Sequence, residues 1–210
     1  MGGTLICFAR EPVPGQVKTR LIPPLGPVGA TRLYRALLGV TLEAAAAVPG
    51  VHRELWCADG PRDGGVCGRL ARRYDMSLRH QPPGDLGRRM EAALAEALTH
   101  SERAVLIGSD CPQFNLAYLA SAFAALETAD AVLGPAADGG YVLIGLRRIS
   151  PELFADMPWG TGLVLARTRA ALRGLDWSWV ELPTLRDLDV PEDLQAFPGL
   201  ADTPRPSSDS

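Results

Sequence analysis

Apolar runs alternate with segments of helical spacing along most of the chain. The runs predict strands at 3–9, 51–58, 76–81, 103–109, 130–134, 141–146 and 177–182. Helical spacing and helix-boundary signals predict helices at 30–48, 69–74, 86–98, 116–127, 162–173 and 191–197. This alternation predicts a three-layer α/β/α fold with a mainly parallel central sheet.

The length of 210 residues fits one domain, which we place at residues 1–198. The polar, Pro- and Ser-containing end of the chain cannot bury enough apolar surface to order itself, so we expect a disordered tail at 199–210. No apolar run approaches 18 residues, and the N-terminus has no charged leader followed by a long apolar core. We therefore expect neither a membrane span nor a signal peptide.

Charge and cysteine content narrow the class of ligand and the compartment. The formal net charge is −3, which disfavours nucleic acid as a main ligand, whereas a nucleotide needs only a few local cations. The four cysteines form no C-x-x-C pair and lie mostly in apolar runs, which predicts buried free thiols in a reducing cytoplasm. The three histidines are scattered along the sequence and predict no zinc site.

The segment after the first predicted strand is rich in cations. Arg10, Lys18 and Arg20 lie within eleven residues, and Gly15 lets the backbone approach a ligand closely. Such a loop suits a diphosphate or triphosphate, because cations offset the charge and backbone N–H groups donate hydrogen bonds. A solvated basic loop is the alternative. The loop has neither the G-x-x-x-x-G-K pattern nor a G-x-G-x-x-G pattern.

Two aspartates are candidate metal ligands. Asp110 ends the most apolar predicted strand, where an unpaired carboxylate is unfavourable unless it binds a cation. Magnesium prefers one or two carboxylates together with phosphate oxygens and water. Asp189, in an acidic stretch at 186–194, is a candidate second ligand. The alternatives are that Asp110 caps the following helix and that Asp189 is an ordinary acid at a helix N-terminus.

Three further segments carry candidate binding residues. Asp138 lies in the stretch GPAADGGY at 134–141, although Asp-Gly is also a favoured hairpin turn. The stretch GDLGRRM at 84–90 opens a predicted helix whose N-terminus could hold a base or a phosphate, and a solvated helix end is equally compatible. Trp159 in the stretch MPWGT at 157–161 is either a packing residue or a flat stacking surface.

Taken together, these motifs resemble a bacterial family of GT-A-type glycosyltransferase-like proteins of unknown function (DUF2064 type). The matching stretches are FAREPVPGQVKTRL, GDLGRRM, GSDCP, GPAADGGY, WGT and DLDVPEDL, and the resemblance runs from about residue 5 to 197. The wider superfamily is similar to nucleotide-diphospho-sugar transferases and nucleotidyltransferases. The resemblance implies a nucleotide-binding catalytic domain of GT-A type.

The resemblance also implies roles for individual residues. Asp110 and Asp189 would bind Mg²⁺ or Mn²⁺, and Asp110 and Asp138 would be catalytic. The implied nucleotide- and phosphate-binding residues are Ala9, Arg10, Gly15, Lys18, Arg20, Gly84, Asp85 and Gly87. The implied substrate-binding residues are Gly139, Gly140, Tyr141, Trp159 and Thr161. One departure from the sugar-nucleotide synthetases is the first loop, which here is Pro-rich and has a single internal glycine.

From these features we expect a magnesium-dependent glycosyltransferase that uses a nucleotide-sugar donor and an acceptor that the sequence does not name. Transfer of a nucleotidyl group is the alternative chemistry, since the motifs do not determine which bond breaks. Two other hypotheses are a non-catalytic nucleotide-binding module, which would need no metal, and a structural or partner-binding protein.

Overall fold

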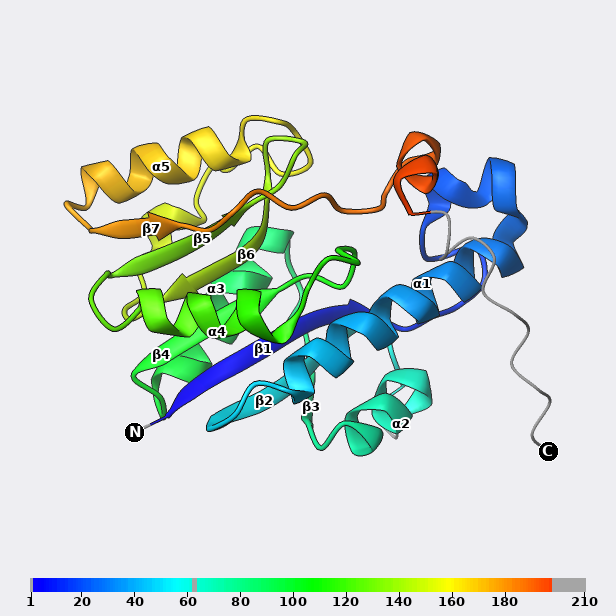
Figure 1. The fold of residues 1–210 in the computed structure, drawn as a ribbon, viewed down its shortest axis with the longest axis horizontal. Helices are drawn as coiled ribbons and strands as arrows, with labels where there is room; N and C mark the ends of the chain where they lie inside the picture. The colour runs from blue at the N-terminus through cyan, green and yellow to red at the C-terminus, as the bar shows by residue number, and fades with distance from the viewer. Residues whose placement is uncertain (1, 62–63, 198–210) are drawn as a thin grey trace.

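The computed structural model describes residues 2–61 and 64–197, and in these residues seven strands form one sheet (Figure 1). The strands are β1 (Gly3–Arg10), β2 (Val51–Ala58), β3 (Ser77–His80), β4 (Arg103–Ile107), β5 (Ala131–Pro135), β6 (Tyr141–Leu146) and β7 (Trp179–Glu181). Their order is β3-β2-β1-β4-β6-β5-β7. Only β6 runs antiparallel to its neighbours. The predicted mainly parallel sheet is confirmed.

Helices cover both faces of the sheet. They are α1 (Ile22–Ala46), α2 (Gly65–Arg73), α3 (Leu86–Leu98), α4 (Leu116–Ala125) and α5 (Val164–Gly174), with 3-10 turns η1 (Thr19–Leu21), η2 (Pro151–Leu153) and η3 (Pro191–Ala196). Alternate residues of β1 face opposite layers, because side chains along a strand alternate in direction. Leu5 and Cys7 join the core with α1, α2 and α4, whereas Ile6 and Phe8 join the core with α3 and α5. The α/β/α prediction is therefore confirmed.

Two helix predictions need correction. The first helix was expected to begin at residue 30, but α1 begins at Ile22 and is interrupted at Gly26, where φ is 68°. Its first turn contains Pro23 and Pro24, which signal a loop in sequence but are tolerated where the first N–H groups have no helical partner. The last helix, expected at 191–197, is the 3-10 turn η3 instead.

The chain after β7 returns to the start of the fold. Figure 1 shows this orange-to-red segment crossing from β7 to the blue loop and helix at the beginning of α1. A small core joins the two regions, in which Leu188 packs with Leu21, Leu33 and Leu37. Segments near residues 20 and 190 therefore lie side by side.

Two other expectations concern the chain ends and the membrane. The tail predicted at 199–210 lies outside the described residues. Within the described part of the chain, no helix is both long and apolar enough to cross a bilayer.

Candidate active site

A cavity of about 590 Å³ opens where the parallel strands end. The loops after β1, β4 and β5 all contribute to it, as expected for ligand sites beyond the carboxyl ends of parallel strands. The start of α3, the loop around Trp159 and the segment before η3 complete its wall. The predicted site residues on this wall are Ala9, Arg10, Lys18, Arg20, Asp110, Asp138, Gly140, Tyr141, Trp159, Thr161 and Asp189.

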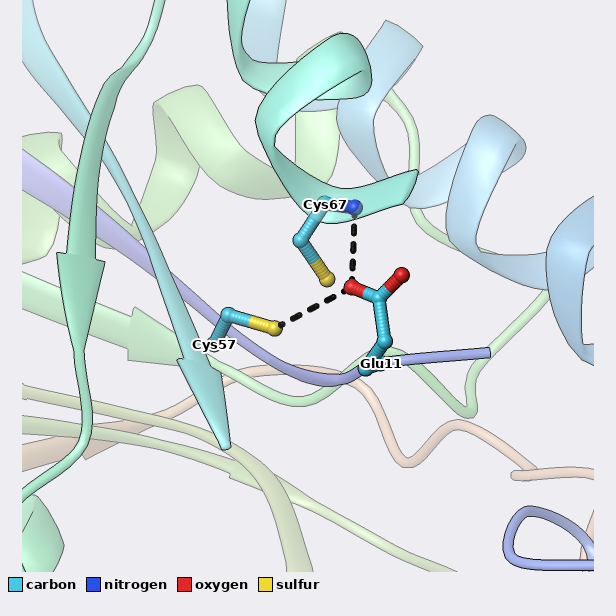
Figure 2. Close-up of side chains that lie close together, drawn as sticks. All are labelled: Glu11, Cys57 and Cys67. Carbon is cyan, nitrogen blue, oxygen red and sulfur yellow. Dashed lines mark hydrogen bonds between the residues drawn. The ribbon is translucent and has the colours of Figure 1, made fainter. Parts of the chain in front are cut away.

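The loop after β1 is anchored by Glu11, a buried carboxylate. Its Oε2 atom accepts hydrogen bonds from the Cys67 backbone N–H at 3.2 Å and from the Cys57 thiol at 3.9 Å (Figure 2). Oε1 accepts the Val66 N–H at the start of α2, where a carboxylate also meets the positive end of the helix dipole. Glu11 thus fixes the direction in which the chain leaves β1, directly after Arg10. Sequence reasoning missed this role.

Tyr34 ties the ends of two central strands together. Its hydroxyl oxygen accepts the Arg10 backbone N–H at 2.8 Å and lies 3.1 Å from the Ser109 hydroxyl. Burial, followed by the negative charge of Asp110, raises the pKa of Tyr34 above its ordinary value. The hydroxyl therefore stays protonated and can serve both bonds. Sequence reasoning missed Tyr34 because it lies within the apolar pattern of α1.

Lys18 is the cation most deeply placed in the site, with a side chain that is 3% exposed. Its Nζ atom donates to the Leu188 carbonyl oxygen at 2.6 Å and lies 2.6 Å from Asp110 Oδ1 and 3.6 Å from Asp189 Oδ1. Both carboxylates contact one nitrogen atom, so the two residues predicted to share a metal ion are close neighbours. In this structure a lysine ammonium lies between them.

The capping alternative for Asp110 is wrong, whereas Asp189 does lie just before the 3-10 turn η3, as its alternative expected. Asn115 caps α4, because its side chain accepts the Tyr118 N–H at 3.0 Å. The Asp193 carboxylate accepts the backbone N–H groups of Asp189 and Val190 before η3. Among the described residues, the caps of α4 and η3 are therefore supplied by Asn115 and Asp193.

Two other carboxylates, those of Asp138 and Asp187, line the same cavity. Burial raises the pKa of Asp187 above its ordinary value, and the negative charges of Asp138, Asp189 and Asp110 raise it further. Arg20 pairs with Asp189 at 2.8 Å and offsets part of this charge. The cavity wall therefore carries four aspartates, two of which contact the Lys18 ammonium. The sequence identified the acidic stretch at 186–194 but did not single out Asp187.

The hairpin turn between β5 and β6 places Asp138 at the cavity. Its Oδ1 atom accepts the Gly140 N–H at 2.8 Å, which is the local bond of an Asx turn. Gly139 has φ of 89°, and a side chain there would collide with the backbone of Gly162. The turn interpretation thus holds for the backbone, while the carboxylate still lies on the cavity wall.

The start of α3 contributes differently from the prediction. Asp85 caps the helix by accepting the Arg88 N–H at 2.9 Å. A side chain at Gly87 would approach Trp159 Nε1 to 2.8 Å, so this glycine allows the indole to pack against the helix. Neither residue lines the cavity, and the same holds for Gly15, Gly84 and Gly139. Instead α3 lines it with Leu86, Arg89 and Met90.

Two aromatic rings form one wall of the cavity. Tyr141 and Trp159 meet edge to face, with ring centroids 6.4 Å apart. Trp159 is half-buried, so it both packs on α3 and presents surface to the cavity. The packing and stacking readings of Trp159 are compatible.

Comparison with known proteins now places the chain in a family. Residues 41–161 match the family model described as "Uncharacterized protein conserved in bacteria (DUF2064)". The chain belongs to this family. The resemblance drawn from the motifs is therefore confirmed. No curated protein matches the chain.

Solved structures agree with this assignment. A candidate nucleotide-diphospho-sugar transferase of Desulfovibrio desulfuricans is 30% identical, with a TM-score of 0.84 over 99% of this chain and 92% of that one. 4-Diphosphocytidyl-2C-methyl-D-erythritol synthase of Anaerococcus prevotii is 11% identical, with a TM-score of 0.59 over 93% and 94% of the two chains. The second likeness concerns the fold alone, which is that of the nucleotide-diphospho-sugar transferases.

A third neighbour was solved with a metal ion. This Mycobacterium tuberculosis protein, a complex with manganese, is 16% identical, with a TM-score of 0.52 over 93% of this chain and 97% of that one. At this identity the likeness again concerns the fold alone.

Proposed function

We propose that this protein is a magnesium-dependent glycosyltransferase that uses a nucleotide-sugar donor. The observation that carries the proposal is the charge pattern of the cavity. Asp110, Asp138, Asp187 and Asp189 converge there, and only Lys18 and Arg20 among the described residues form ion pairs with members of this acidic cluster. Carboxylates so close together repel one another unless cations offset their charge.

The donor set fits a hard divalent cation. Asp110 and Asp189 would hold the ion, and both retain exposed carboxylate surface, at 46% and 41% of the side chain. Oxygen ligands of this kind suit Mg²⁺ or Mn²⁺. When bound, the cation would offset the charge that develops on a departing diphosphate. Lys18 would remain beside the carboxylates and limit how strongly they attract a second cation.

The chain's own cations would position the nucleotide phosphates. Arg10 is exposed at the cavity and pairs with Asp59 at 2.9 Å, a surface contact that a phosphate can replace at little loss. Arg20, near the end of the same loop, also lines the cavity. The aromatic wall of Tyr141 and Trp159 offers an apolar surface for a sugar or base ring. Asp138 would orient or deprotonate the acceptor from the opposite turn.

Nucleotidyl transfer is the second candidate. Three cations in the loop after β1 suit a triphosphate as well as a diphosphate, and this observation favours it. Because the two reactions release different products, one assay separates them. The protein is incubated with nucleoside triphosphates and with nucleotide sugars, with and without Mg²⁺. Release of a nucleoside diphosphate from a nucleotide sugar supports the first proposal, whereas release of pyrophosphate from a triphosphate supports the second.

Binding is the simpler first measurement. A ligand at 100 times its dissociation constant stabilises a protein by about 2.7 kcal/mol, which gives a readable thermal shift. We expect nucleotide-dependent shifts that require Mg²⁺. Equal shifts in chelator would indicate a nucleotide-binding module that needs no metal.

Asp138→Asn should keep the fold and reduce turnover at least about 10-fold. This is a lower limit, because the usual contribution of a catalytic acid or base is about 100-fold or more. Asparagine also suits this turn and can accept the Gly140 N–H. Melting temperature and turnover are measured together. Turnover at the wild-type rate would reduce Asp138 to a turn residue.

Tyr34→Phe should lower the free energy of unfolding by about 1–3 kcal/mol, because the part-buried Arg10 N–H loses its acceptor. Nucleotide affinity should fall as well, since the end of β1 is no longer held against the Ser109 hydroxyl. Denaturant unfolding and titration calorimetry measure the two effects. A stable variant with unchanged affinity would contradict this positioning role.

A further inference from the structure

Two of the chain's three histidines lie close together where the parallel strands begin, at the end of the sheet opposite the cavity. His52 lies near the beginning of β2 and His100 follows α3, and their rings approach edge to face with centroids 5.9 Å apart. Glu54, two residues after His52, lies on the same face of β2 because side chains alternate along a strand. Ligand atoms of the three residues all lie within 4.8 Å of one another.

Glu54 is an unusual residue to find at this place. It is 0% exposed, and its Oε2 atom accepts the Trp56 indole N–H at 2.7 Å. Its Oε1 atom is buried and has no hydrogen-bond partner. The nearest cationic or ionisable groups to Oε1 are His52 Nε2 at 3.4 Å and Arg79 Nε at 3.6 Å. A buried carboxylate oxygen without a hydrogen bond is unfavourable, and a bound cation would relieve it.

We propose that His52, Glu54 and His100 form a binding site for a divalent transition metal such as Zn²⁺, separate from the nucleotide cavity. Two imidazoles and one carboxylate are a donor set that zinc accepts, whereas Mg²⁺ prefers oxygen atoms alone. Three protein ligands leave a coordination position for water.

The distances support this assignment. Ligands bound at about 2.0–2.1 Å in a tetrahedron are about 3.3 Å apart. The separation of His52 Nε2 and Glu54 Oε1, at 3.4 Å, matches that value without movement of the strand. His100 is exposed and follows the end of a helix, so its ring can adjust.

Each ring nitrogen of His100 lies near a threonine hydroxyl. Nε2 lies 3.4 Å from the Thr4 hydroxyl, and Nδ1 lies 3.4 Å from the Thr99 hydroxyl. Whichever nitrogen bound the metal, the other would retain a threonine hydroxyl. Such outer contacts orient the imidazoles of metal sites.

Arg79 is the group that opposes metal binding. Its guanidinium contacts Glu54 from the side and also reaches Glu96, at 3.6 Å in each case. A bound dication would repel Arg79, which is exposed and can move toward Glu96. Removal of the Arg79 charge should therefore strengthen metal binding. If the Glu54–Arg79 pair were only structural and no metal bound here, this substitution would not change the affinity for zinc.

The structure contains a second cluster of possible metal ligands, which can be compared with the histidine cluster. Glu11, Cys57 and Cys67 also have their ligand atoms within 4.8 Å of one another (Figure 2). There, however, both carboxylate oxygens already accept backbone N–H groups. Hydrogen bonding to Cys57 and burial raise the pKa of the Cys67 thiol, which opposes loss of its proton to a metal. We therefore assign the metal to the histidine cluster.

The test is titration of the chelator-treated full-length protein with Zn²⁺, with Mg²⁺ as the comparison ion. We expect one tightly bound zinc ion per chain at this histidine site, with no comparable Mg²⁺ binding here. His52→Gln and His100→Gln should each weaken zinc binding at least about 100-fold, more than the usual effect of losing an outer partner. His80→Gln, at the third and uninvolved histidine, should leave it unchanged. Arg79→Gln should lower the dissociation constant.

A Co²⁺ spectrum distinguishes the two clusters. Nitrogen and oxygen ligands give no thiolate charge-transfer band, and Cys67→Ser should leave the cobalt spectrum and the zinc affinity unchanged. Because His52 and His100 are exposed, their variants should fold normally, which circular dichroism verifies. Wild-type zinc affinity in both histidine variants, or loss of binding in Cys67→Ser, would overturn the assignment.

Discussion

Asp110→Asn should abolish magnesium-dependent nucleotide binding, with a loss of affinity of at least about 100-fold, or about 2.7 kcal/mol. Asparagine keeps the shape of the side chain but removes the charge that would attract the cation. Asp110 Oδ1 already lies 2.6 Å from the Lys18 ammonium, so the carboxylate faces a cation at this place. Titration calorimetry with a nucleotide, in Mg²⁺ and in chelator, measures the effect.

The same substitution should change the stability of the metal-free protein little, by about 1 kcal/mol or less. It removes an ion pair with Lys18, but it also removes repulsion from Asp187 and Asp189. The carboxylate is 46% exposed, so solvent screens both effects. Asp75→Asn is a matched control, because Asp75 is exposed, has φ of 52° and lies outside the cavity. An equal loss of affinity in chelator would mean that Asp110 does not act through a metal.

The sequence predicted the sheet well because its signals are local. The limits of β2 and β6 match their predicted ranges, since turn residues mark where each strand begins, with Pro49-Gly50 before β2 and Gly139-Gly140 before β6. The beginning of α1 was missed for an equally local reason. Pro23, Pro24 and Gly26 signal a loop, yet a first helical turn tolerates proline, and the glycine marks an interruption rather than an end.

The sequence identifies candidate site residues where they lie at or just after the end of a predicted strand. Arg10 ends β1, Asp110 and Asp138 follow β4 and β5, and the parallel arrangement of these strands brings all three residues to one cavity. Their chemical roles remain predictions, since proximity alone does not assign them.

Residues whose role depends on tertiary contacts could not be found in this way. Tyr34 fits the apolar face of α1, and only the fold brings its hydroxyl to Arg10 and Ser109. His52 and His100 are separated by a strand, two helices and a turn, and sequence position suggested no relation between them. Glu54 could have been grouped with His52 from the period of the strand, but its burial is a property of the packed structure.

Lys18 lies in the predicted basic loop but makes contacts that the sequence did not predict. The sequence placed its ammonium on nucleotide phosphates, because the loop around it is basic. In the structure, Lys18 adopts a left-handed backbone conformation with φ of 48°, and its ammonium reaches Asp110, Asp189 and the Leu188 carbonyl. This links the first loop to the C-terminal segment. A phosphate or a metal ion would have to bind beside this ammonium or displace it.

Lys18→Met should therefore lower the free energy of unfolding in chelator by about 1–3 kcal/mol. Loss of one partner from a fully buried ion pair is worth about 3–5 kcal/mol, and the value here is smaller because both carboxylates are more than 40% exposed. Arg20→Met is the matched control. It also removes a cation from Asp189, but its side chain is 66% exposed, so we expect a change below about 1 kcal/mol.

Magnesium should restore much of the stability that Lys18→Met removes. Without the ammonium, Asp110 and Asp189 lose the cation that lies between them, and their repulsion favours any divalent ion that takes its place. The rise in melting temperature on adding Mg²⁺ should therefore be larger in Lys18→Met than in the wild-type protein. Asp110→Asn combined with Lys18→Met should lose that gain, since the ion then lacks a ligand. Identical magnesium shifts in wild type and Lys18→Met would show that the ammonium and the metal do not share these carboxylates, and the metal site would have to lie elsewhere in the cavity.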